Sequence, residues 1–403
     1  MKKIISILIA VITMLSALCI PVSAYDKGSF LPSLPKEDKD PVVYYADAGA
    51  YGDRYLTIRT LNMKNAPKNL GADGYYVSVY KNKKWEKLFF QKGLTNSDLY
   101  CVSGLKPDTE YKFRITLYKN VNGKAKTLDK YENGLCTLKE KPYIKSVVKK
   151  NNKITIKIDS YSKWDEYYVY TTRYLKGFKA AQDKFINQGQ NVDLLKYIKS
   201  KDFTTDGENT ISFNVGADDE DFTFSIWASR VDKDGNKVSS KEMTYDDYVH
   251  SRDMEKALGK AAKTKSAADN KIISKIIKRC VRDDLTAEDN AYNIFCYVHL
   301  NAAYEYDGSK IDKDPIQAVF VKGKAQCLQW ASAYRIIMQC YGFKDITVVG
   351  GTKSGTSHWW CELKVNGQTY IIDPYPNVYT FLDDYHNWFY YEGHGTWSPY
   401  VKS

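Results

Sequence analysis

The sequence predicts a multidomain chain in which two all-β sandwiches precede an α+β domain, and three observations lead to this fold class. From about Asp40, short segments of alternating apolar and polar residues are separated by turn residues, as in a β-sandwich. A second pattern of this kind begins after Lys141-Pro142. From about Asp253, apolar residues recur at three- and four-residue spacing, which predicts amphipathic helices, and a strand hairpin follows around Asn366-Gly367.

The first 24 residues have the pattern of a secretory signal. Lys2-Lys3 precede an apolar run, and Val22-Ser23-Ala24 provides small residues for cleavage. We expect the mature chain to begin at Tyr25, with residues 25–40 as a leader; a retained membrane anchor is the alternative. Because no other stretch is long and apolar enough to cross a bilayer, we expect a secreted or extracellular protein without a membrane span, with association with the cell wall as an option.

Composition gives little support to a nucleic-acid partner. The formal net charge is +11, or about +9 without the two signal lysines, and the lysines are scattered along the chain rather than clustered. The charge is also compatible with attraction to an anionic cell wall. Most of the 34 tyrosines are expected in cores and cross-strand pairs, as in residues 75–80, while a glycan- or peptide-binding surface is the alternative for a minority.

Residues 41–139 are predicted to form the first sandwich. The run from Leu105 to Tyr111 places a tyrosine where its hydroxyl can bond back to the upstream loop while its ring packs in the core. This run resembles the tyrosine corner of fibronectin type III modules, which implies a module of that kind here.

Residues 140–245 are predicted to form a second, more divergent sandwich. Its strands alternate in the same way, but the tyrosine-corner motif is absent, so the resemblance to fibronectin type III modules is weaker. The connection from Tyr174 to Lys201 is long for a hairpin and is expected to contain a helix. The stretch from Asp232 to Asn236 has no glutamate at the spacing of a calcium loop, so we interpret it as a hairpin turn.

A thiol nucleophile is predicted at the start of a helix in residues 250–403. After Gly323 the chain reaches Cys327, from which apolar residues recur at helical spacing up to Gly342, a suitable C-terminal cap. The amino end of a helix offers unpaired N–H groups and a partial positive charge, which favour a thiolate. A cysteine on an apolar helix face is more often a core residue, so Cys327 alone does not define a site.

Two further residues give the cysteine a catalytic context. The residues from His358 to Val365 alternate as a strand, and Asn366-Gly367 predicts a two-residue hairpin. That turn sets the register and brings Asp373 to the face of the sheet that carries His358. We therefore predict Cys327 as nucleophile, His358 as general base and later acid, and Asp373 as the group that orients the imidazole.

These residues resemble the transglutaminase-like superfamily. The resemblance rests on Gly323 and Cys327 at a helix start with Ala331 one turn on, on His358 with Trp360 two residues later, and on Asp373-Pro374 after the hairpin. It covers roughly residues 250 to 385 and implies a papain-like α+β scaffold with Cys, His and Asp in this order. Paired helices and a tyrosine-rich turn at Tyr304-Glu305-Tyr306-Asp307 are also similar to that family. We expect both turn tyrosines in the core, with a place in the cleft as the alternative. Gln326 stands directly before the cysteine, where many members have a glycine nearby.

An odd number of cysteines remains after the signal, so at least one thiol is expected to be free, and Cys327 is the candidate. Cys101 with Cys136, and Cys340 with Cys361, are pairs that export permits without requiring. No Cys-x-x-Cys motif occurs and the histidines are dispersed, so no metal and no cofactor are expected. His386 and His394, in the aromatic tail, are not assigned to the site.

The predicted function is thiol-based acyl transfer on a peptide or glutamine carboxamide through a thioester. Water as the acceptor gives a peptidase or amidase, and an amine gives a cross-link. The sequence leaves the choice of acceptor open. It also leaves open the oligomeric state and the identity of the protein or peptide substrate, which could include a cell-wall peptide or glycan. The alternative is a non-catalytic cell-surface or adhesion protein that keeps an inert cysteine domain.

Overall fold

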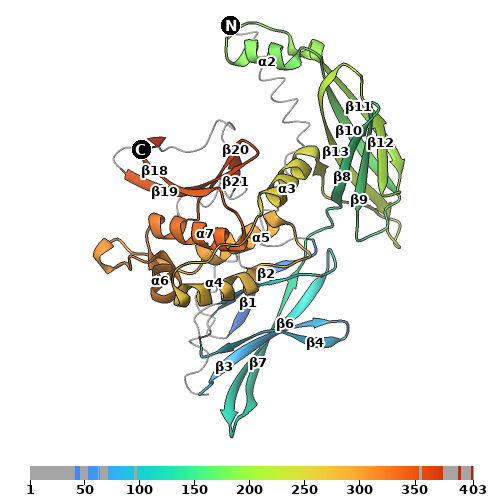
Figure 1. The fold of residues 1–403 in the computed structure, drawn as a ribbon. Coiled ribbons are helices and arrows are strands. Elements are labelled where there is room, and N and C mark those ends of the chain that lie inside the picture. The colour runs from blue at the N-terminus through green and yellow to red at the C-terminus, as the bar shows by residue number, and fades with distance from the viewer. Residues whose placement is uncertain are drawn as a thin grey trace.

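The computed structural model describes most of the chain from Pro41 onward. The described residues are 41–45, 53–61, 63, 71–94, 98–353, 356–374, 389–391 and 401–402. The predicted signal, the leader, His386 and His394 lie outside them. Within this part of the chain, no helix is both long and apolar enough to cross a membrane. Figure 1 shows a β-sheet-rich N-terminal region and a C-terminal region that contains most of the helices.

The first β unit, residues 41–139, consists of two antiparallel sheets around one core. One sheet has the order β1-β2-β5 and the other β4-β3-β6-β7. Alternate residues of these strands are buried between the sheets, as the period of two predicts. The bounds are β1 Val42–Tyr45, β2 Leu56–Leu61, β3 Gly74–Lys81, β4 Lys84–Lys92, β5 Asp98–Val102, β6 Glu110–Val121 and β7 Lys124–Cys136.

The predicted tyrosine corner is confirmed in this unit. The Tyr111 hydroxyl accepts a hydrogen bond from the Lys106 N–H at 2.7 Å, while its ring is buried in the core. The motif thus fixes the loop that enters β6.

The second β unit, residues 140–244, repeats this arrangement of sheets around a separate core. One sheet has the order β12-β9-β8 and the other β11-β10-β13-β14, with the short β15 also paired to β13. The predicted helix between Tyr174 and Lys201 is present as α2 (Phe178–Ile186), and the turn at 232–236 joins β13 to β14 as a hairpin. The bounds are β8 Tyr143–Lys150, β9 Lys153–Asp159, β10 Glu166–Leu175, β11 Ile198–Asp206, β12 Thr210–Asn214, β13 Asp219–Val231, β14 Lys237–Ser239 and β15 Met243–Thr244.

The C-terminal unit packs helices against a mainly antiparallel sheet. Its first helix begins earlier than the sequence suggested, because Thr244 caps it through a reciprocal pair of hydrogen bonds with Asp247. Ser266 and Thr286 cap the next two helices in the usual way. The bounds are α3 Tyr245–Ala257, α4 Ala267–Cys280, α5 Ala287–His299, α6 Pro315–Gln317 and α7 Cys327–Tyr341.

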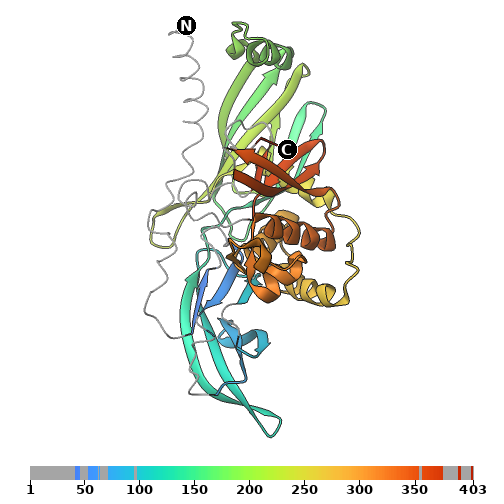
Figure 2. The ribbon, with the colours of Figure 1, turned by 90° about the vertical axis from the view of Figure 1, so that its left-hand side faces the viewer.

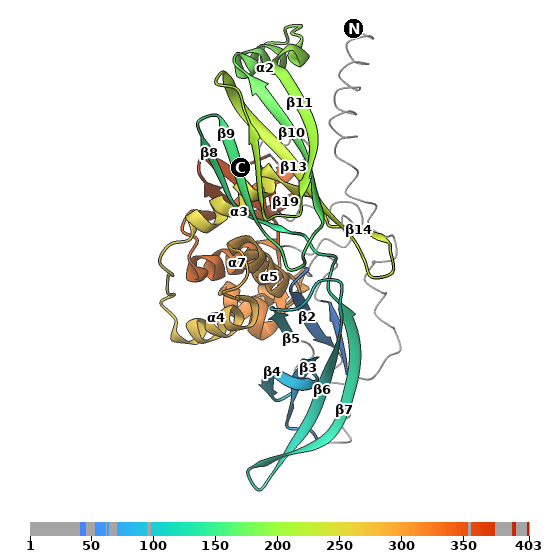
Figure 3. The same ribbon diagram turned by 90° about the vertical axis from the view of Figure 1, so that its right-hand side faces the viewer.

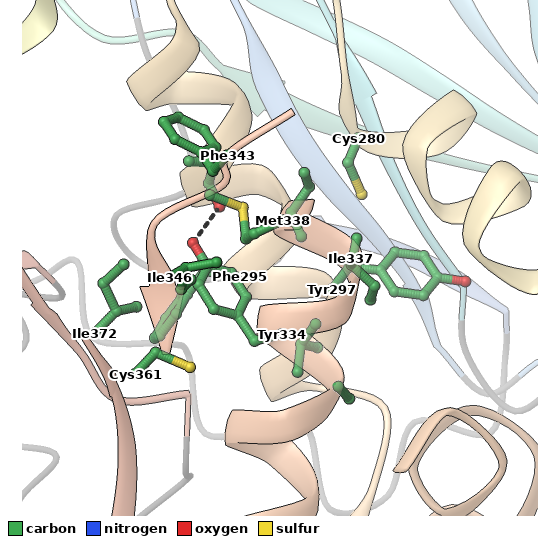
Figure 4. Close-up of a cluster of buried hydrophobic side chains, with 14 of the residues drawn as sticks. Cys280, Phe295, Tyr297, Tyr334, Ile337, Met338, Phe343, Ile346, Cys361 and Ile372 are labelled. Carbon is green, nitrogen blue, oxygen red and sulfur yellow. Dashed lines mark hydrogen bonds between the residues drawn. The ribbon is translucent and has the colours of Figure 1, made fainter. Parts of the chain in front are cut away.

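The sheet of this unit lies against α7, as Figures 1 and 2 show. Its strand order is β21-β20-β19-β18-β22, with bounds β18 Ile346–Lys353, β19 Thr356–Val365, β20 Gln368–Ile372, β21 Phe389–Tyr391 and β22 Val401–Lys402. Figure 4 shows Tyr334, Ile337 and Met338 of α7 in one cluster with Phe295 of α5 and Ile372 of β20. This core fixes the helix that begins at Cys327 relative to the hairpin that carries His358.

The first β unit is attached to the helices through a buried ion pair and a further polar contact. Arg279 of α4 donates to the Asp98 carboxylate of β5 at 3.2 Å, with both side chains almost wholly buried, and its guanidinium stacks on Phe89 at 3.9 Å. Ser103 donates to Asp284 at 2.7 Å a little further along the same junction. Figure 3 shows β5 beside α4 and α5. The first β unit therefore forms part of the support for the C-terminal helices.

Candidate active site

The cysteine side of the site is the start of α7. Cys327 is the first residue of the helix and is half-buried, whereas Trp330 and Ala331, one turn on, are fully buried and anchor the helix in the core. The N–H groups of the first helical turn have no partner within the helix. The sulfur thus lies at the positive end of a helix that cannot easily shift.

The chain reaches Cys327 through a short extended segment. Gly323 has φ +66°, a left-handed conformation that favours glycine, and it ends the turn of helix at Ala318–Lys322. Strand β17 (Lys324–Ala325) then pairs in parallel with β16 (Ala303–Tyr304). The Gln326 N–H donates to the Gln329 side chain at 3.2 Å, which caps the helix. Gln326 thus joins this extended segment to the start of the helix.

The histidine side of the site is the hairpin of β19 and β20. Its predicted register is confirmed: Cys361 pairs with Ile372, Leu363 with Tyr370, and Val365 with Gln368. The strand begins at Thr356 rather than at His358, because it also pairs with β18, in which Lys353 lies opposite Thr356. His358 is therefore held within a strand that has a partner.

The structure brings the three predicted site residues together. His358 Nε2 and Asp373 Oδ2 are 2.5 Å apart, and the same ring forms a hydrogen bond with the Cys327 thiol. Because Asp373 engages Nε2, the nitrogen left for the thiol is Nδ1. The His358 side chain is 8% exposed and that of Asp373 is 23% exposed, so water competes weakly for these bonds.

The electrostatics favour a charged imidazole. Burial lowers the pKa of His358, but the hydrogen bonds to Asp373 and Cys327 and the charges of both groups raise it more, to about 9. His358 is therefore an imidazolium at neutral pH. A cation in contact with the sulfur favours the thiolate, which is the nucleophilic form.

One support of this site was not foreseen from the sequence. His299, in the last turn of α5, forms a hydrogen bond with the Pro374 backbone, next to Asp373, and burial lowers its pKa to about 4. The neutral His299 ring thus holds the backbone directly after Asp373 in place. The only signal in the sequence was a histidine near the end of a predicted helix. The bulky Trp359 after His358 packs against Gly350, where a Cβ atom would come within 2.9 Å of the ring.

The other described cysteines are free thiols, and neither disulfide pairing considered from the sequence is present. Cys101 is buried and accepts a hydrogen bond from the Asn293 side chain at 3.3 Å, while Cys136 is exposed at the end of β7. Cys361 donates to the Ala331 carbonyl at 3.0 Å, which holds its sulfur in the core. Cys327 is thus distinguished by its imidazole partner.

The expectation that Tyr304 and Tyr306 lie in the core is wrong. Tyr304 is 38% exposed and Tyr306 is 87% exposed. The short segment that carries them runs beside β17 at the entrance to α7, so it is a surface turn at the site rather than an internal strand. Apolar character alone did not reveal this, since aromatic residues occur in both settings.

The described residues offer no arrangement of three or more His, Cys, Asp or Glu side chains that would hold a metal ion. The chemistry available from the residues themselves is that of a thiol, an imidazole and a carboxyl group at a helix start. Such a constellation can attack a carbonyl carbon and pass a proton to a leaving group.

One comparison with known proteins supports the resemblance to the transglutaminase-like superfamily. Residues 274–374 match the family model described as the transglutaminase-like superfamily. The chain therefore contains a transglutaminase-like domain, as Cys327, His358 and Asp373 indicated. A comparison with curated proteins finds no match.

Two solved structures are similar over part of the chain. A two-domain fibronectin type III segment from chicken tenascin is 14% identical with a TM-score of 0.25, covering 51% of this chain and 95% of that one. A crystal structure of a TGase is 16% identical with a TM-score of 0.23, and the match covers 34% of this chain and 40% of that one.

Proposed function

We propose that this chain is a transglutaminase-like enzyme that transfers an acyl group through a thioester on Cys327. The observation that carries the proposal is the His358 ring, which bonds to the Cys327 thiol on one side and to the Asp373 carboxylate at 2.5 Å on the other. This is the arrangement in which a thiol, a base and an orienting acid act as one unit.

The reaction begins with the Cys327 thiolate attacking the carbonyl carbon of a glutamine carboxamide or a peptide. A C–S bond forms, and the carbonyl oxygen becomes an oxyanion near the N–H groups of the first turn of α7. His358 gives its proton to the departing nitrogen, which leaves as ammonia or an amine. The C–N bond breaks and a thioester remains on the sulfur.

The second half of the reaction regenerates the thiolate. An acceptor attacks the thioester carbonyl while neutral His358 takes its proton, and the C–S bond breaks. Water as acceptor gives a carboxylic acid, and a primary amine gives a new amide. Asp373 holds the imidazole in the orientation that both halves need and stabilises it while it is charged.

The rest of the chain is proposed to serve as exported binding modules. The β1–β7 and β8–β15 units share the same order of strands in their two sheets, which supports two fibronectin type III-like sandwiches at 41–139 and 140–245, ahead of a catalytic domain at 250–403. With the signal-like start of the sequence, this supports a secreted or cell-wall-associated protein that acts on a protein, peptide or cell-wall peptide.

The test is an acyl-transfer assay on the mature chain. We would incubate it with a glutamine-containing peptide, with and without a tagged primary amine, and follow ammonia release and amide formation by mass spectrometry. The wild type is expected to release ammonia, and the amine then shows which acceptor it prefers. Cys327→Ser is expected to abolish release, whereas Cys136→Ser, at an exposed thiol elsewhere, keeps it. Equal release by Cys327→Ser and the wild type would exclude this mechanism.

A further inference from the structure

Two tyrosine rings form an exposed platform beside the nucleophile. Tyr304 pairs across the small parallel sheet with Ala325, two residues before Cys327, and its ring lies parallel to that of Trp330 with centroids 6.4 Å apart. Tyr306 meets the Tyr304 ring edge-on at 4.7 Å and is 87% exposed. We call Tyr304 and Tyr306 the tyrosine platform.

Tyr304 is close enough to Cys327 for a charge on the sulfur to affect the pKa of the tyrosine hydroxyl. Burial raises the pKa of Tyr304, and a nearby Cys327 thiolate raises it further. Because Tyr304 also pairs with Ala325, two residues before the nucleophile, a group that binds on these rings lies near the start of α7. A substrate whose carbonyl carbon meets Cys327 must place its adjoining atoms in this neighbourhood.

The platform is held in position by the residue before the nucleophile. Gln326 Nε2 donates to the Glu305 carbonyl at 3.0 Å and to the Tyr306 carbonyl at 3.4 Å, while the Glu305 N–H donates to the Ala325 carbonyl at 3.0 Å. One side chain thus ties the turn to the start of α7. This gives a structural reason for a glutamine at this position.

The charges that flank the platform are neutralised locally. Glu305 pairs with Lys324 at 2.9 Å, and Asp307 pairs with Lys310 at 3.1 Å. The residue after the nucleophile, Leu328, is 37% exposed and adds apolar surface at the same helix start. A surface of exposed rings between paired charges suits an uncharged flat or apolar group better than an ionic one.

We propose that Tyr304 and Tyr306 form the acyl-donor subsite of the Cys327 centre and bind an uncharged aromatic or apolar group next to the reacting amide of a peptide donor. The inference rests on the proposed function, since it assigns the donor of that reaction. Gln326 acts as a positioning residue that keeps the platform at the sulfur.

The test compares two alkylating reagents that differ only in an aromatic ring. Iodoacetamide and N-benzyl-iodoacetamide both form a C–S bond to Cys327 with loss of iodide, so their rate constants report access to the same sulfur. We would measure both by mass spectrometry of the Cys327 peptide in the full mature chain. The readout is the ratio of the benzyl rate constant to the plain one.

We expect the wild type to prefer the benzyl reagent. Tyr306→Ala is expected to lower the ratio about fivefold, from the usual contribution of an aromatic contact. Since Tyr306 is mostly exposed, this variant should fold normally, as its thermal unfolding would verify. Tyr304→Phe keeps the ring and should keep the ratio. Tyr161→Ala removes a tyrosine that is 50% exposed on the second β unit and should also leave the ratio unchanged.

A ratio that is the same in Tyr306→Ala and the wild type would overturn the subsite. That result is distinct from a failure of the proposed function. If His358→Ala left the plain iodoacetamide rate unchanged, the catalytic proposal would be at fault, whatever the ratio.

Discussion

Replacing Asp373 by asparagine should remove the charge that keeps His358 protonated. Asp373 Oδ2 lies 2.5 Å from His358 Nε2, and its bond and charge work against burial of the ring, which lowers the pKa. An amide has nearly the same shape but no charge. In the Asp373→Asn variant, burial still lowers the pKa and only Cys327 still raises it, so we expect the pKa of His358 to fall from about 9 toward its ordinary value of about 6.5.

The magnitude follows from that change in pKa. Moving an imidazole from about 9 to about 6.5 corresponds to about 3 kcal/mol at about 1.4 kcal/mol per pH unit. If the whole upward shift is lost, the imidazolium fraction of His358 at pH 7.5 should drop from nearly all molecules to roughly one tenth. The proton for the leaving group is then mostly absent, so acyl transfer at this pH should fall by up to about tenfold.

The assay is an NMR titration of histidine-labelled protein. The His358 signals are identified by their loss in His358→Gln, and their pH dependence is followed in the wild type and in Asp373→Asn. We expect a midpoint near 9 in the wild type and a clearly lower one, toward about 6.5, in the variant. A wild-type midpoint near 6.5, or no difference between the two proteins, would refute the reasoning.

The same pair should show a difference in stability with pH. Folding raises the pKa of His358, so its contribution to stability is fully present below about pH 6.5 and is lost as the pH rises through about 9. Urea unfolding of the wild type should thus lose up to about 3 kcal/mol over this window relative to Asp373→Asn. Parallel curves for the two proteins would contradict this.

Three further predictions concern the supports of the site. Arg279→Ala removes the buried partner of the Asp98 carboxylate, leaves it only the more exposed Lys275 at 3.7 Å, and should lower the free energy of unfolding in urea by up to about 3–5 kcal/mol. His299→Phe removes the hydrogen bond to the Pro374 backbone, next to Asp373. If this bond positions Asp373, the variant should lower the pKa of His358 measured by NMR, whereas a role in stability alone would leave that pKa unchanged. Burial and two nearby carboxylates raise the pKa of Glu288 to about 8, so its contribution to stability is lost as the pH rises from about 4.5 through 8. Glu288→Gln should remove this loss. We expect the loss to be only on the order of 1–2 kcal/mol, because the side chain is still 32% exposed.

Each of these has an outcome that counts against it. Lys275→Ala alters an exposed lysine 3.7 Å from the same Asp98. If it lowered the free energy of unfolding as much as Arg279→Ala, the buried pair would contribute no more than the exposed one. An unchanged His358 midpoint in His299→Phe would show that α5 does not position Asp373. Parallel stability curves of the wild type and Glu288→Gln between about pH 4.5 and 8 would show that ionisation of Glu288 costs no stability.

Local sequence signals predicted the hairpin and the tyrosine corner well. Asn366 and Gly367 both have positive φ, at +51° and +79°, as a tight two-residue turn requires, so the register of β19 and β20 followed from two residues. The bond from the Lys106 N–H to the Tyr111 hydroxyl spans only five positions. Such features depend on neighbours in the chain, which a single sequence displays.

Contacts between distant segments were beyond the same reasoning. Arg279 and Asp98 are far apart in sequence, and nothing in either local pattern names the other as a partner. The exposure of Tyr306 depends on the turn beside β17, and the role of Gln326 depends on carbonyl groups about twenty residues earlier. Burial and long-range hydrogen bonds of this kind arise from packing, so composition and periodicity do not reveal them.

The most direct test of the central claim compares two thiols in one molecule. Cys136 is the more exposed, but burial and nearby carboxylates raise its pKa, whereas Cys327 is half-buried and bonded to the imidazole of His358. With limiting iodoacetamide at pH 6.5, mapped by mass spectrometry, we predict that Cys327 is labelled at least about tenfold faster than Cys136 and that His358→Ala removes this advantage. Faster labelling of Cys136 in the wild type, with no effect of His358→Ala on Cys327, would contradict the account.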